Sequence, residues 1–185
     1  KFPIIQYSFH GEYWDVFIQK KIYDSPKDKR RNKSMHISIL NKNEEYAGDI
    51  TPLEGWNTLN QIEESILVDV RTKAELNFVG QPDLSNIGKS TINIELQHFP
   101  GGIKNVNFVK QLEDELINQG HNKESVLLFI CRSGARSATA ASLMHDTGWI
   151  NSYNIAFGFE GDPNQNHHRG ETNGWKYEEL PWIQQ

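Results

Sequence analysis

The only cysteine of the chain, Cys131, lies in "FICRSGARSATAAS", between an apolar run and a series of small residues. Arg132 and Arg136 follow it within five positions. A cysteine that ends an apolar strand is most often an inert core residue. Cationic neighbours change this interpretation, because they stabilise the thiolate, which is the reactive form of the side chain. The spacing therefore indicates a nucleophile that works next to an anion.

The residues after the cysteine form a small turn that could surround such an anion. Gly134 allows the backbone to curl, while Ser133 and Ala135 keep the side chains short. A helix expected to begin near Ser137 directs its free N–H groups and the positive end of its dipole at the turn. The pattern predicts a thiolate at the base of a ring of N–H donors.

Strands and helices alternate on both sides of this turn, which predicts an α/β domain with a mainly parallel sheet. The strand before Cys131 is a continuous apolar run, as in strands buried on both faces. In open sheets of this kind, ligands bind beyond the carboxyl ends of the strands, where Cys131 stands. The expected strands are 65–70, 91–96, 125–130 and 152–157, and the expected helices are 51–62, 108–120 and 137–147.

Two of these helices have an expected apolar face. Thr51 and Glu54 form a capping box around Pro52 at the start of the first. The apolar residues are Leu53, Trp56 and Leu59 in the first helix and Phe108, Val109, Leu112, Leu116 and Ile117 in the second.

The first part of the chain differs in composition from the rest. The stretch 20–33, "KKIYDSPKDKRRNK", is strongly basic and indicates a solvated linker. We expect residues 1–45 to be an N-terminal extension, disordered in part, and residues 46–185 to be the ordered domain. Residues 1–34 are expected to be dispensable for folding.

Composition excludes several other classes of function. The formal net charge of −5 gives no general attraction to nucleic acid or to anionic membranes, and neither partner is expected. A single cysteine rules out an internal disulfide and cysteine-rich zinc sites, and no metal or other cofactor is expected. No apolar run approaches the length of a membrane span, so the expected location is the cytoplasm.

At four places the sequence resembles the rhodanese-like family, specifically its single-domain thiosulfate sulfurtransferases. "CRSGAR" followed by Ser137 is similar to the family's active-site loop, and Asp69-Val70-Arg71 with Glu75 is similar to its D-V-R-x-x-x-E motif. Ile92-Asn93-Ile94 and the segment from Gly158 to Leu180-Pro181 also resemble family elements, so the likeness covers roughly residues 47 to 182.

The resemblance implies a three-layer α/β/α fold and a two-step sulfur exchange. Cys131 would take sulfur from thiosulfate or a similar small anion, form a persulfide and pass the sulfur to a thiol or cyanide. Arg132 and Arg136 would hold the donor, and no second cysteine is present to resolve the persulfide, so the acceptor is external. The resemblance also gives a supporting role to Asp69, Arg71 and Glu75, in which we expect Arg71 and Glu75 to form an ion pair.

The sequence departs from the family pattern after Gly158. An insert, "FEGDPNQNHHRGETNG", precedes Trp175, and its His167 and His168 are candidates to line the mouth of the site. We expect Trp175 and Trp182 to be packing residues.

Two other functions stay open from the sequence. A phosphatase or arsenate reductase of the same fold uses C-x5-R, a loop one residue longer than the spacing from Cys131 to Arg136. A non-catalytic or redox-sensing binding module is the second alternative, although inactive family members usually lose the cysteine.

Overall fold

The computed structural model describes residues 4–10, 13–19 and 35–184, and its centre is a five-stranded sheet. The strand order is β4-β11-β10-β5-β7, and every neighbouring pair is parallel, as the alternation of strands and helices predicted. The five strands are β4 (Gly48–Ile50), β5 (Ser65–Asp69), β7 (Thr91–Asn93), β10 (Val126–Ile130) and β11 (Ser152–Ile155).

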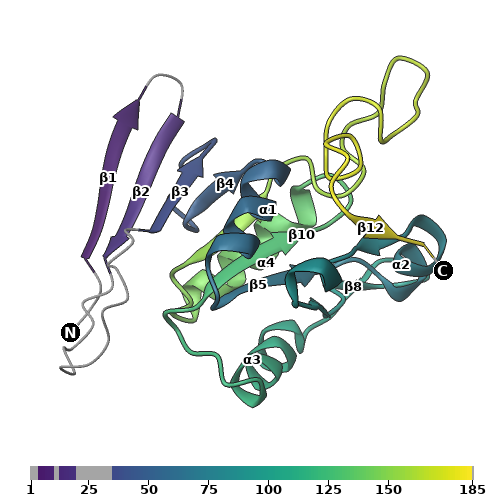
Figure 1. The fold of residues 1–185 in the computed structure, drawn as a ribbon. Helices are drawn as coiled ribbons and strands as arrows, with labels where there is room; N and C mark the ends of the chain where they lie inside the picture. Colours follow the sequence, from purple (N-terminus) through teal and green to yellow (C-terminus); the bar gives the residue numbers. More distant parts are fainter. Residues whose placement is uncertain (1–3, 11–12, 20–34, 185) are drawn as a thin grey trace.

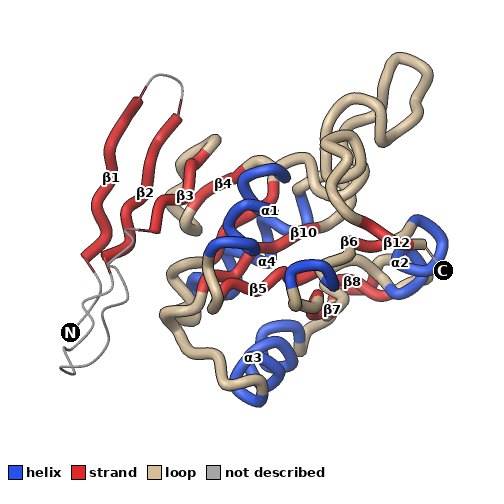
Figure 2. The backbone as a smooth tube through the Cα atoms, viewed as in Figure 1, coloured by secondary structure: helices blue, strands red, loops and turns tan. Residues whose placement is uncertain are grey.

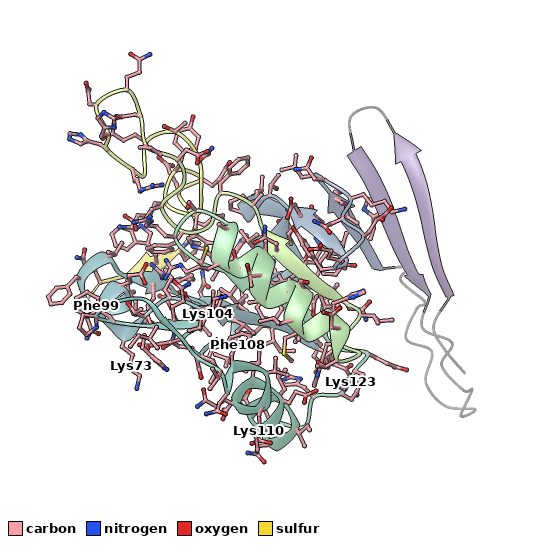
Figure 3. All side chains as sticks on the ribbon, turned by 180° about the vertical axis from the view of Figure 1, so that it is seen from behind. Lys73, Phe99, Lys104, Phe108, Lys110 and Lys123 are labelled. Carbon is pink, nitrogen blue, oxygen red and sulfur yellow. The ribbon has the colours of Figure 1, made fainter. Side chains whose placement is uncertain are left out.

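Helices cover both faces of this sheet, which gives the expected three layers (Figures 1 and 2). Along β10, Leu128 and Ile130 face the cluster that includes Leu59 of α1. Leu127 and Phe129 alternate with them and face the cluster that holds α3 and α4. Figure 3 shows α4 running across this second face. The helices are α1 (Pro52–Gln61), α2 (Lys73–Val79), α3 (Phe108–Asn118) and α4 (Ala135–Asp146).

The buried faces of α1 and α3 differ from those that the sequence predicted. In α1 the Cβ of any larger residue at Gly55 would lie 3.0 Å from Ile155, so the helix meets the sheet at this glycine. The buried face is therefore rotated away from Leu53, which is 48% exposed. In α3 the buried residues include Leu112 and Leu116, while Ile117 at the edge is 61% exposed.

The hydrophobic core takes in part of the predicted N-terminal extension. Strand β3 carries Ile37 and Ile39, both fully buried against the α1 side of the sheet, ahead of the expected domain start at residue 46. The three strands β1 (Ile4–His10), β2 (Tyr13–Gln19) and β3 (Met35–Ile39) form an antiparallel sheet beside the central one (Figure 1). The predicted basic linker at 20–33 lies outside the described residues.

Short elements complete the domain near the carboxyl edge of the sheet. Strand β12 pairs antiparallel with β6, and β8 pairs antiparallel with β9. Within the described part of the chain, no helix has both the length and the apolar character needed to cross a membrane. These elements are β6 (Gln81–Pro82), the 3-10 turn Ser85–Ile87, β8 (Gln97–His98), β9 (Ile103–Lys104) and β12 (Trp182–Ile183).

Candidate active site

Cys131 is the first residue after β10, and its side chain is enclosed by the turn that follows. The residue is 2% exposed, and the Gly134 N–H donates a hydrogen bond of 3.2 Å to its Sγ. The Ser137 Oγ lies 3.3 Å from the same sulfur. Helix α4 begins at Ala135, two residues earlier than expected, because Gly134 takes a left-handed φ of 101° and turns the chain into the helix.

Residues 158–160 hold the turn by its backbone carbonyl groups. The Phe159 N–H donates to the Cys131 carbonyl at 2.7 Å, and the Glu160 N–H donates to the Arg132 carbonyl at 2.9 Å. Gly158 lies so close that a Cβ there would stand 2.4 Å from the Cys131 oxygen. The sequence reasoning missed this clamp, because a contact between two backbones leaves no side-chain pattern.

Gly158→Ala is therefore expected to open the Cys131 turn. The new Cβ would overlap two carbonyl groups, and Gly158 also has a φ of +58°, so the variant combines a clash with backbone strain. We expect a loss of about 2–4 kcal/mol of unfolding free energy in urea titrations. Gly170→Ala is the matched control, since it has positive φ but its Cβ would meet only the Lys176 side chain, at 4.0 Å. Equal losses of unfolding free energy in the two variants would mean that backbone strain, and not the clash at Gly158, causes the loss.

Arg136 extends from the first turn of α4 to Glu75 of α2. Its Nη2 lies 2.6 Å from Oε1 and its Nη1 lies 2.9 Å from Oε2, so the contact is bidentate. Burial alone would raise the pKa of Glu75, but hydrogen bonds from Arg136 and the Thr72 backbone outweigh it and lower the pKa to about 2. The same pair raises the pKa of Arg136. Thr72 and Glu75 also form a capping box, a T-x-x-E signal that the sequence carried and that we overlooked.

The expected ion pair between Arg71 and Glu75 is wrong. Arg71 pairs instead with Asp69, from Nη2 to Oδ2 at 2.6 Å, and both side chains are fully buried. The chain leaves strand β5 at Asp69, and the Arg71 backbone N–H also donates to the Asp69 carboxylate at 3.0 Å. This local turn folds Arg71 back on Asp69 and leaves Glu75 free to reach Arg136.

The Asp69–Arg71 pair is connected to the Cys131 turn through Phe159. The Arg71 guanidinium lies 4.1 Å from the centre of the Phe159 ring, and the Phe159 N–H holds the Cys131 carbonyl. Asn93 in β7, a residue to which we gave no separate role, donates to the carbonyls of Asp69 and Arg71 at 2.8 and 2.9 Å. The three predicted supporting residues thus all lie near the turn, in different pairs from those expected.

Comparison with known proteins identifies the family of this domain. The family model described as "Rhodanese-like domain" matches residues 51–162, which include Asp69, Arg71, Glu75 and the whole Cys131 turn. The chain belongs to the rhodanese-like family. This membership supports a role in sulfur transfer.

Individual relatives match this chain over most of the rhodanese-like domain. The uncharacterized protein RP600 of Rickettsia prowazekii is 38% identical over 135 residues, 72% of this chain and 95% of the relative. The crystal structure of Rv0390 from M. tuberculosis is 41% identical with a TM-score of 0.68, covering 76% of this chain and 99% of that one. A tRNA uridine(34) hydroxylase of Prochlorococcus marinus is 26% identical over 77% of this chain and 42% of its own length.

In this rhodanese-like domain the insert after Gly158 forms a polar loop that projects from the body (Figures 1 and 3). Its tip is closed by hydrogen bonds from the Asn164 N–H to the His168 carbonyl at 2.7 Å and from the His168 N–H to the Asn164 Oδ1 at 2.9 Å. His167 and His168 are exposed, and no described contact brings them to Cys131. The described residues also contain no group of three His, Cys, Asp or Glu side chains able to hold a metal ion.

The remaining candidates lie at the rim of the turn or in the core. Arg132 and Ala135 are exposed, and Ser133 is half-buried. Trp175 is fully buried with its ring 6.1 Å from that of Trp56, which confirms its predicted packing role.

Proposed function

We propose that this chain is a sulfurtransferase that takes sulfane sulfur from thiosulfate or a related anionic donor. The sulfur would pass through a persulfide on Cys131 to a thiol or cyanide acceptor. The observation that carries the proposal is the hydrogen bonding around Sγ, where the Gly134 N–H and the Ser137 hydroxyl meet the sulfur at 3.2 and 3.3 Å. The Gly134 N–H donates to the sulfur and the Ser137 hydroxyl is able to, and such donors favour an anion on that atom.

The first step follows from the chemistry of the thiolate. The Cys131 thiolate attacks the outer sulfur of thiosulfate, a new S–S bond forms, the S–S bond of the donor breaks and sulfite leaves with the electron pair. The product is a persulfide whose outer sulfur carries the negative charge. The N-terminus of α4 follows the turn directly, so its unpaired N–H groups and dipole stabilise charge at this position.

Ser137 has a separate part in the proposal because its hydroxyl has a choice of partners. Its Oγ lies 3.0 Å from the Gly134 carbonyl and 3.3 Å from Sγ, and it carries one hydrogen. Donation to the carbonyl suits the protonated thiol, which can itself donate to Ser137. Donation to the sulfur suits the thiolate, so rotation of one hydroxyl can follow the charge of Cys131.

The second step needs an acceptor from outside the chain. An acceptor thiolate or cyanide attacks the outer persulfide sulfur, and the Cys131 thiolate is released with the electron pair. Cys131 is the only cysteine, so no internal thiol can take the sulfur. The acceptor class is therefore a small thiol, a protein thiol or cyanide.

Phosphate chemistry is disfavoured by the position of Arg136. In addition to the short spacing from Cys131, both terminal nitrogens of its guanidinium are hydrogen-bonded to Glu75. A tetrahedral oxyanion above the turn would have to compete with this carboxylate for the arginine.

Sulfur loading tests the proposed function directly. Intact-mass spectrometry of the full chain after incubation with thiosulfate is expected to show one added sulfur atom, mapped to the peptide that holds Cys131. Adding a thiol or cyanide should remove it. If no sulfane donor adds sulfur, the non-catalytic binding module becomes the better assignment. Turnover of nitrophenyl phosphate that depends on Cys131 would favour the phosphatase.

A further inference from the structure

We propose that Glu75 makes the site select its sulfur donor by charge. Because Glu75 neutralises Arg136, the site favours a singly charged donor over doubly charged thiosulfate. This inference rests on the proposed function and refines it. It gives Arg136 a different role from the one that the family resemblance implied, which was to hold the donor dianion. In the structure Arg136 is instead half of an ion pair that carries no net charge.

The first support is the geometry of that pair. Both terminal nitrogens of Arg136 are occupied by the two Glu75 oxygens, and the two side chains are only 22% and 24% exposed. The low pKa of Glu75 means that its carboxylate stays charged throughout the range in which a persulfide enzyme would work. A dianion approaching Cys131 therefore meets a carboxylate as well as a guanidinium.

The second support is that two further cations near the site, Arg71 and Lys176, have partners of their own. Arg71 is paired with buried Asp69. The Lys176 ammonium donates to the Val79 carbonyl and lies 4.0 Å from the centre of the Trp182 ring, with Glu160 near enough to interact electrostatically. Among the described residues, Arg132 has no carboxylate within ion-pair distance, and its side chain is exposed to solvent, which screens its charge.

The charge that remains at the turn suits one negative charge better than two. A helix N-terminus contributes roughly half an elementary charge, and the hydrogen bonds to Sγ add partial charges of the same kind. The persulfide formed on Cys131 carries a single negative charge whichever donor is used. A donor that also carries one charge meets about half the repulsion from Glu75 that a dianion meets, and the helix still attracts it.

Two small sulfur donors of nearly equal shape but different charge can test this preference. Thiosulfate and the methanethiosulfonate anion both present an outer sulfur, and they differ by a methyl group in place of one charged oxygen. In each reaction the Cys131 thiolate bonds to the outer sulfur, and sulfite or methanesulfinate leaves with the electron pair. We would measure single-turnover sulfur loading of the full chain by intact-mass spectrometry and take the rate ratio of thiosulfate to methanethiosulfonate.

Glu75→Gln is expected to raise this ratio about tenfold, because it removes the negative charge that balances Arg136 at the start of α4. The increase should shrink as ionic strength rises. Glutamine can still complete the capping box with Thr72, so α2 is expected to keep its first turn. Glu75→Asp keeps the charge and should keep the wild-type ratio.

Glu95→Gln is the matched control, since Glu95 also accepts a hydrogen bond from the first turn of α2, at the Lys73 N–H, but does not contact Arg136. Its ratio should equal that of the wild type.

An unchanged or lower ratio in Glu75→Gln, or the same increase in Glu95→Gln, would overturn the inference. Should Glu75→Gln fail to fold, the ionic-strength dependence of the wild-type ratio provides the second test, because screening of Glu75 should raise the ratio and a fall would contradict the inference. If neither donor loads sulfur on the wild type, it is the proposed function that fails.

Discussion

A serine in place of Cys131 is expected to lower the rate of sulfur loading by more than about 10³-fold, to below detection. The serine hydroxyl stays protonated at neutral pH and is a far weaker nucleophile towards sulfur than a thiolate. Its oxygen can still accept from the Gly134 N–H and contact Ser137, so the turn keeps its hydrogen bonds. The measurement is intact-mass spectrometry of wild type and variant after the same exposure to thiosulfate.

The unfolding free energy of the Cys131→Ser variant provides the control. It should lie within about 1 kcal/mol of the wild type, since one small polar group replaces another in the same enclosed position. A variant that unfolds easily would make the lost loading uninformative, and Cys131→Ala would then be compared. Loading of the serine variant at the wild-type rate would show that sulfur attaches elsewhere on the chain and would defeat the assignment of Cys131 as nucleophile.

The position of Cys131 was predictable because it depends on local pattern alone. An apolar run bounded by small residues and arginines predicts a strand, a turn and a helix, and β10 and α4 follow in that order. The same reasoning predicted the buried strand β5, whose five residues are all buried. Periodicity and small-residue content are properties of neighbouring residues, so no knowledge of distant contacts was needed.

The partners of the charged residues were not predictable in the same way. Asp69, Arg71, Glu75 and Arg136 offer several opposite-charge pairings, and the sequence does not say which side chain each backbone turn brings within reach. Glu75 meets Arg136 across 61 positions of the chain, and that contact depends on how α2 and α4 lie against each other. The clamp from Phe159 to Cys131 is also a long-range contact between backbones, and side-chain patterning does not encode such contacts.

Asp69→Asn is expected to destabilise the domain by about 3–5 kcal/mol, because it leaves the Arg71 guanidinium buried without a counter-charge. The wild-type carboxylate receives hydrogen bonds from the Arg71 Nε and Nη2, at 3.0 and 2.6 Å, with both side chains fully buried. Urea unfolding followed by circular dichroism gives the free energy. Asp114→Asn is the control, since its pair with Lys110 on α3 (Figure 3) is exposed and worth less than about 1 kcal/mol.

Loading rates of the same variant separate stability from positioning. The Arg71 guanidinium lies over the Phe159 ring, and Phe159 fixes the Cys131 carbonyl, so a displaced Arg71 should also slow sulfur loading under conditions where the variant is still folded. Replacing both partners together, Asp69→Leu with Arg71→Met, removes the unpaired charge and should recover part of the lost stability. If the double variant recovers stability but loads sulfur slowly, the buried pair acts by holding the Cys131 turn in place. Full recovery of both properties would instead leave the pair without a role in positioning the nucleophile.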